Sequence, residues 1–184
     1  MTQKTAHSRA SLQRHFVPYA ALPLRLIVGY GFLAHGIAKW TKGPDAFATI
    51  LQATGVPFPH LMAWITIATE IFGGITILLG AFVVWVSLPM IILLAVAILT
   101  VHLPYGFSSI KLMSISHGRA QFGPPGYECD FLYIACIVAL VLSGPSLWSV
   151  DAYRLRGERT DLRWPAPSAE PRTSRVTNRI RSPR

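Results

Sequence analysis

The sequence predicts an all-α integral membrane protein: an antiparallel bundle of four transmembrane helices with disordered cytoplasmic tails. Three observations support this prediction. Hydrophobic residues make up 52% of the chain and charged residues only 14%, against about 25% charged residues in soluble domains. The apolar residues gather into four runs of about 20 residues, the helix length that crosses a bilayer core of about 30 Å. Most Lys and Arg residues lie outside these runs, and nine of the 17 follow Asp151.

The first apolar run covers residues 20–40 and follows a basic segment, residues 1–18, which we interpret as a cytoplasmic arm. A cleaved signal peptide would also begin with basic residues, but the length of this run and the three later runs favour a retained helix. The next linker, residues 41–59, is rich in Gly and Pro, and its middle, residues 45–53, can form a short interfacial helix.

The second and third apolar runs cover residues 60–80 and 81–103. The third is the most apolar, and Pro89 is expected to kink it, because neighbouring helices can help to satisfy the carbonyl group that a proline frees. Residues 104–126 are rich in Gly, Pro and Ser, and they are expected to form a loop. The fourth run covers residues 128–147 and completes the set of predicted spans.

The chain is thus divided into the basic arm, a transmembrane domain over residues 19–151, and an Arg- and Pro-rich tail over residues 152–184 that is expected to be disordered. Four spans place both termini on one side of the membrane. Positive residues are more numerous in the short terminal flanks than in the two longer loops, which predicts cytoplasmic termini. These residues are expected to attract anionic lipid headgroups, and they lack the aromatic interleaving of a nucleic-acid-binding module. We therefore expect a lipid bilayer as partner and no nucleic acid.

Glu70 lies midway along the second run, where a charged side chain costs on the order of 3 kcal/mol. Gly73 and Gly74 lie on its side of the predicted helix, and small residues allow two helices to approach closely. Gly29 and Gly36 share a face of the first run in the same way. We therefore expect these glycines to mark helix contacts and Glu70 to face the bundle and not the lipid.

The partner of Glu70 is predicted from the direction of helical side chains, which lean toward the N-terminus of their own helix. On the first run, His35 and Lys39 share a face at positions i and i+4, and both lean toward the membrane centre. Arg25 leans toward the cytoplasm instead and can extend its charge to the surface. The sequence therefore favours His35 and Lys39 over Arg25 as interaction partners of Glu70.

Three more ionisable residues fall at the outer level of the predicted bundle and complete a candidate polar pocket, which opens outward. Its members are Glu70, His35, Lys39, Arg25, His102, Glu128 and Asp130. In a structural alternative, Glu70 pairs with Lys39 or His35 only to fix helix register, and the two later acids lie hydrated at a helix N-terminus, where negative charge is favoured. A metal site would need His35, His102 and Glu128 to converge, which nothing in the sequence indicates, so no metal is expected.

Several segments resemble the DoxX family. RLIVGYGFLAHGIAKW at residues 25–40 and TGVPFPHLMAWITIATEIFGGITILLG at residues 54–80 resemble its first half, and VHLPYGF, GYE and SGPSLWSVD resemble its second half, within residues 101–151. The resemblance implies a four-helix protein of the bacterial inner membrane. Some members of this family are associated with quinone-coupled thiosulfate oxidation or with membrane oxidoreductase assemblies. The family offers no established catalytic set to transfer to this chain, and the Arg-rich tail lies outside the shared pattern.

Three functions follow as hypotheses. The first is a subunit or partner of a membrane redox system linked to quinones, sulfur or thiols, with a quinone as the candidate cofactor. The second is a non-enzymatic membrane scaffold for soluble redox partner proteins. The third is a small-solute or proton transporter that uses Glu70, because buried acids often relay protons. Whether the chain is itself an enzyme, and whether it forms a homo-oligomer, is left open by the sequence.

Overall fold

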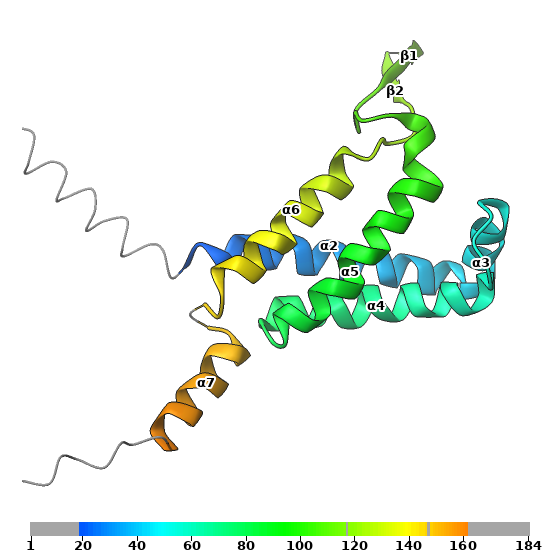
Figure 1. Cartoon of the computed structure of the whole chain (residues 1–184). Helices are drawn as coiled ribbons and strands as arrows, with labels where there is room; N and C mark the ends of the chain where they lie inside the picture. The colour runs from blue at the N-terminus through cyan, green and yellow to red at the C-terminus, as the bar shows by residue number, and fades with distance from the viewer. Residues whose placement is uncertain (1–18, 117, 147, 162–184) are drawn as a thin grey trace, which may run out of the picture.

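The computed structural model describes residues 19–116, 118–146 and 148–161, and most of these residues are helical (Figure 1). A π-helical turn (Ile98–His102) and a 3-10 turn (Leu103–Tyr105) prolong the helix α5. The helices are α2 (Ala21–Lys42), α3 (Pro44–Ala53), α4 (Pro59–Leu79), α5 (Val83–Ala97), α6 (Glu128–Ser143) and α7 (Val150–Asp161). The predicted interfacial helix in the first linker is present as α3.

Three of the helices in the described residues are long and apolar enough to cross a membrane: α2, α4 and the continuous helix Val83–Tyr105. The fourth predicted span is represented by α6, which has 16 residues and is therefore about 24 Å long. It ends four residues earlier than predicted, because Gly144 adopts a positive φ of 67° and Pro145 follows it. The structure thus shows three helices of spanning length and one shorter apolar helix.

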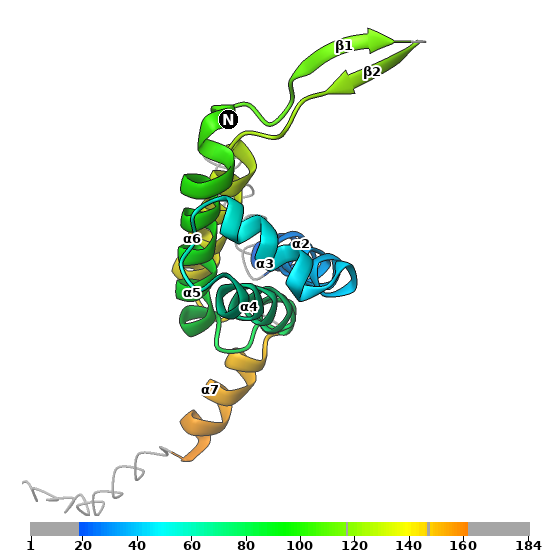
Figure 2. The ribbon, with the colours of Figure 1, turned by 90° about the vertical axis from the view of Figure 1, so that its right-hand side faces the viewer.

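The helices form two antiparallel pairs, which cross steeply instead of running along one common axis (Figures 1 and 2). In Figure 2, α2 and α4 are seen nearly end-on, whereas α5 and α6 stand upright. This arrangement differs from the predicted bundle of four aligned helices. α2 and α5 begin, and α4 and α6 end, at what we call the Arg25 end. The opposite ends of α2 and α4 meet at α3, whereas those of α5 and α6 lie apart from α3, at the segment that connects α5 to α6 (Figure 1).

The pair formed by α2 and α4 is held at very short distance by glycines. A Cβ atom on Gly29 would lie 2.8 Å from the carbonyl oxygen of Gly74, and one on Gly74 would lie 2.7 Å from that of Gly29. On the other side of α4, a Cβ atom on Gly73 would lie 3.0 Å from Sδ of Met90 in α5. The predicted role of these glycines as helix contacts is confirmed.

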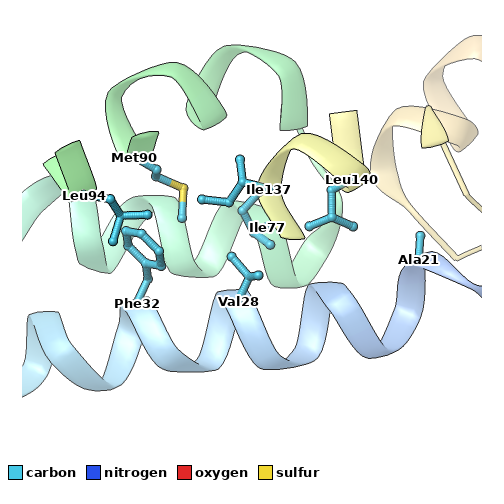
Figure 3. Packing of buried hydrophobic residues seen from close by; sticks show 8 residues of the cluster. All are labelled: Ala21, Val28, Phe32, Ile77, Met90, Leu94, Ile137 and Leu140. Atoms are coloured by element: carbon cyan, nitrogen blue, oxygen red, sulfur yellow. The ribbon is translucent and has the colours of Figure 1, made fainter. Parts of the chain in front are cut away.

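The apolar core lies where the two helix pairs cross (Figure 3). All four helices contribute to it, and Phe32 of α2 also packs edge-to-face on Tyr133 of α6, with ring centroids 5.7 Å apart. The buried members are Ala21, Val28, Phe32, Ile77, Met90, Leu94, Ile137 and Leu140. The crossing is therefore a packed contact, and it fixes α5 and α6 against the pair that carries Glu70.

The loop predicted over residues 104–126 contains a two-stranded antiparallel hairpin, so the fold is not strictly all-α. Its strands are β1 (Leu112–Ser116) and β2 (Arg119–Phe122). Gly118 in the connecting turn has a φ of 73°, a conformation that glycine adopts at little cost. The hairpin projects from the end of α5 and α6 (Figure 2).

Arg25 is buried at the Arg25 end, with 4% of its surface exposed. Its guanidinium donates hydrogen bonds to the carbonyl oxygens of Ile77 (3.2 Å), Leu78 (2.8 Å) and Trp148 (3.3 Å) and to Oγ of Ser146 (3.3 Å). The prediction that Arg25 extends to the membrane surface is therefore wrong. The reason is that α4 ends at Leu79, so the carbonyl oxygens of Ile77 and Leu78 lack the usual N–H donor four residues later, and the guanidinium donates to both.

The segment after α6 is fixed in the same region by Asp151. Its carboxylate accepts hydrogen bonds from the N–H groups of Phe82 (2.9 Å) and Val83 (3.2 Å), which caps the start of α5. Oγ of Ser149 accepts the N–H of Ala152 (3.1 Å) and so begins α7. The tail that was expected to be disordered from residue 152 is thus helical as far as Asp161, whereas residues 1–18 and 162–184 lie outside the described residues.

Candidate functional site

Glu70 and Lys39 form an ion pair between α4 and α2. Lys39 Nζ donates a short hydrogen bond to Oε1 of Glu70, and the two side chains are 24% and 5% exposed, respectively. The lysine ammonium also lies 4.9 Å from the ring centroid of Phe47, so α3 joins the site through a cation–π contact. The predicted pairing of Glu70 with Lys39 is confirmed.

The second carboxylate oxygen of Glu70, Oε2, is fully buried and has no hydrogen-bond partner among the described residues. Buried polar atoms are nearly always paired, because an unpaired one keeps the cost of losing its water. An oxygen of this kind can accept a hydrogen bond from a bound molecule, or it can carry a proton. Glu70 therefore has one oxygen that is held by Lys39 and a second oxygen that can accept a hydrogen bond or carry a proton.

His35 lies on α2 one helical turn before Lys39, and its side chain is exposed. It is close enough to interact electrostatically with both Glu70 and Asp130. Asp130 belongs to the first turn of α6. His35 therefore interacts with an acid of each helix pair: Glu70 of α4 and Asp130 of α6. A histidine in that position can exchange protons with either acid.

His102, in the π-helical turn that prolongs α5, lies beside Asp130. Its Nε2 is 3.8 Å from Oδ2 of Asp130, and its Nδ1 is 3.2 Å from the carbonyl oxygen of Pro125. Glu128 is used differently, because its Oε2 accepts the backbone N–H of Ser109 (3.0 Å) at the base of the hairpin. The structure therefore groups Glu70, Lys39, His35, Asp130 and His102, gives Glu128 a structural contact, and places Arg25 at the opposite end.

Metal and thiol chemistry have little support in the described residues. No group of three or more His, Cys, Asp or Glu side chains there could hold a metal ion. Cys129 is exposed, Cys136 is half-buried, and both are free thiols. The chemistry available at the site is therefore that of a carboxylate, an ammonium and imidazoles.

An apolar groove of about 430 Å³ on the surface of α2 and α4 was not predicted. Trp40 and Trp64 form one end of it, edge-to-face with ring centroids 5.5 Å apart. The lining residues are Ile37, Trp40, Trp64, Ile67, Ala68, Ile71 and Phe72. The pairing of these two tryptophans across two helices follows from the contact between α2 and α4.

The groove and the ion pair are close neighbours. Ile71 lines the groove and follows Glu70 directly in α4. A Cβ atom on Gly36 of α2 would lie 2.7 Å from Cγ1 of Ile71 and 3.0 Å from Cβ of Glu70. A side chain at Gly36 would therefore collide with both Glu70 and its groove-lining neighbour Ile71.

Comparison with known proteins finds a match to one family. The DoxX family model matches residues 20–103, which include α2, α3, α4 and α5. "Putative oxidoreductase CatD" of Bacillus subtilis (strain 168) is 27% identical over 138 residues, covering 75% of this chain and 89% of the relative. "Uncharacterized membrane protein Rv3486" of Mycobacterium tuberculosis (strain ATCC 25618 / H37Rv) is 28% identical over 143 residues, covering 73% and 80%. No solved structure matches the chain. This membrane protein is thus similar to the DoxX family over residues 20–103.

Proposed function

We propose that this protein is a subunit or partner of a membrane redox system, and that it binds a quinone in the groove on α2 and α4 and exchanges protons with it through Glu70. The observation that carries the proposal is the unpaired, buried Oε2 of Glu70 beside an apolar groove. The name of the Bacillus relative, an oxidoreductase, supports a redox role. Reduction of a quinone to a quinol takes up two electrons and two protons. In this proposal a soluble redox partner supplies the electrons, and the site described above supplies the protons.

Each part of the site has a separate task in this scheme. The tryptophans and isoleucines of the groove would hold a flat ring and its apolar tail, as apolar pockets with few polar groups usually do. Lys39 would stabilise negative charge that develops on a quinone oxygen during reduction. Glu70 would pass a proton, and His35 would restore it from the aqueous side, because it is exposed and interacts electrostatically with Glu70.

Two variants separate binding from proton transfer. Ala68→Trp fills the groove, so binding of a short-chain quinone, measured as quenching of tryptophan fluorescence in nanodiscs, is expected to weaken about tenfold or more. Glu70→Gln leaves the groove intact and removes the proton, so binding is expected to persist while quinone-dependent thiol oxidation in membrane vesicles falls about tenfold or more. Asp45→Asn, at a side chain that is 89% exposed, is the matched control for loss of a carboxylate.

Unchanged quinone binding in Ala68→Trp, together with normal thiol oxidation in Glu70→Gln, would overturn the proposal. A proton flux in sealed proteoliposomes without quinone that disappears in Glu70→Gln would favour the transporter hypothesis. The scaffold hypothesis predicts that both variants still recruit the redox partner and retain full activity.

We further propose that α6 is the fourth crossing and that the Arg25 end faces the cytoplasm of a bacterial inner membrane. Two arginines of α7, Arg154 and Arg156, extend beyond the Arg25 end, in keeping with the positive-inside rule. The test uses Gln121→Cys or Arg154→Cys in a chain with Cys129→Ser and Cys136→Ser. A membrane-impermeant maleimide is expected to label Gln121→Cys on intact spheroplasts and to label Arg154→Cys only after lysis. The reverse pattern would show the opposite orientation.

A further inference from the structure

The hairpin has one polar and one apolar face, although neither face is covered by the rest of the described structure. Successive side chains of a strand point to opposite faces, and paired residues share a face. Ser114 pairs with Gln121 and Ser116 with Arg119 on one side, whereas Ile115 pairs with Ala120 on the other. Figure 2 shows both strands standing clear of the helices.

A β-bulge gives the apolar face its full length. The register shifts between Leu112 and Ser114, so that Leu112 pairs with Phe122. Phe122 lies two residues from Ala120, and the bulge therefore brings Leu112 to the face of Ile115. Without the bulge, strict alternation would place Leu112 beside Ser114 on the polar face. Leu112, Ile115 and Phe122 are 57%, 71% and 62% exposed, so the face is apolar and bare.

The hairpin begins close to the end of a helix that is long and apolar enough to span a membrane. The spanning helix Val83–Tyr105 ends seven residues before β1 begins. Phe107, Tyr127 and Phe131 stack edge-to-face at the base of the hairpin, with ring centroids 5.6 Å apart in both pairs. Aromatic side chains gather at this depth in membrane proteins, because their rings suit the boundary between acyl chains and headgroups.

The base of the hairpin is fixed by backbone hydrogen bonds. The N–H groups of Gly126, Tyr127 and Glu128 donate to the carbonyl oxygens of Ser108 (3.1 Å), Gly106 (3.1 Å) and Phe107 (3.0 Å), which joins the two ends of the loop. From this base the strands lean to one side of α5 and α6 in Figure 2, and Figure 1 shows them extending beyond the ends of these helices.

The charge of the loop matches an anionic lipid surface. Lys111 and Arg119 flank the strands, and no Asp or Glu occurs between Pro104 and Tyr127 in the sequence. We propose that the apolar face of the hairpin lies in the interfacial layer of the membrane, with Leu112, Ile115 and Phe122 against the acyl chains and the two basic residues at the lipid phosphates. The occupant of this face is the bilayer itself, and the inference does not depend on the proposed redox function.

Neighbouring residues on opposite faces provide the test. Ile115→Cys and Ser114→Cys are labelled with the fluorophore NBD in the full chain carrying Cys129→Ser and Cys136→Ser, reconstituted in vesicles that contain phosphatidylglycerol. Both native side chains are exposed, so neither substitution removes a core contact. The label at residue 115 is expected to emit at shorter wavelength and to be quenched by nitroxide-labelled lipids. The label at residue 114 is expected to be quenched at least threefold more strongly by iodide in the water.

A second pair on the other strand, Phe122→Cys and Gln121→Cys, is expected to repeat the pattern. Equal iodide quenching at both positions of each pair would overturn the proposal. So would protection of residue 115 without quenching by lipid nitroxides, because a protein, such as a second copy of this chain, would then cover the face. Replacing phosphatidylglycerol by phosphatidylcholine is expected to weaken the quenching by lipid nitroxides. Equal quenching in the two lipids would show that Lys111 and Arg119 do not contribute to binding of the hairpin to an anionic surface.

Discussion

Replacing Gly74 with leucine is expected to separate α2 from α4 and to destabilise the protein by about 3 kcal/mol or more. Its Cβ atom would lie 2.7 Å from the carbonyl oxygen of Gly29 and 2.7 Å from the backbone nitrogen of Leu33. Backbone atoms cannot move aside as a side chain can, so the cost lies at or beyond the upper end of the usual range for overpacking, about 1–3 kcal/mol. The measurement is unfolding of the purified protein in mixed micelles of increasing SDS fraction.

Ala34→Leu is the matched control for this change. Ala34 lies on α2 next to Leu33, but its side chain is exposed. The added volume there meets no helix, and stability is expected to stay within about 0.5 kcal/mol of the parent, as for most surface substitutions. If Gly74→Leu and Ala34→Leu unfold at the same SDS fraction, the close contact between α2 and α4 does not hold the fold together.

Lys39→Met is expected to cost more stability than Glu70→Gln. Removing the ammonium leaves a buried carboxylate without its counter-charge, which typically costs about 3–5 kcal/mol; because Lys39 is 24% exposed, the lower end is expected. Glu70→Gln removes the charge that needs compensation, so its cost is smaller. The double variant Lys39→Met with Glu70→Gln should therefore be more stable than Lys39→Met alone.

Thermal unfolding of the four proteins completes a double-mutant cycle, which isolates the coupling between the two side chains. Lys42→Met, at an exposed position in the last turn of α2, controls for the loss of a positive charge from the same helix. Additive effects of the two single changes would show that Lys39 and Glu70 do not stabilise each other, despite their contact.

Local chemistry was sufficient to predict the closest contacts of the fold. Small residues at Gly29 and Gly74 indicated a close helix pair, because only the absence of a side chain permits one. The lean of side chains toward the N-terminus of a helix favoured His35 and Lys39 over Arg25 as partners of Glu70, and Lys39 forms the ion pair. These inferences succeeded because they depend on residues within one pair of adjacent helices.

Features that depend on distant residues were not predictable in the same way. Arg25 meets Ser146 and Trp148 more than 120 positions later, and no local pattern indicates that contact. The steep crossing follows from how α5 packs on Gly73 through Met90, which periodicity does not reveal. The alternation in the hairpin is interrupted at Met113 by the bulge, so the strands were hidden within a loop rich in Gly, Pro and Ser.

The contacts of Arg25 also set an order for the assembly of the protein. Two of its four acceptor groups, on Ser146 and Trp148, belong to the segment after α6, and the other two end α4. During synthesis, a chain that has inserted α2 and α4 therefore holds a half-satisfied guanidinium in its interior. Asp151, which interacts electrostatically with Arg25 and caps α5, comes later still. The hydrogen bonds of Arg25 are therefore complete only once the last part of the domain has been synthesised.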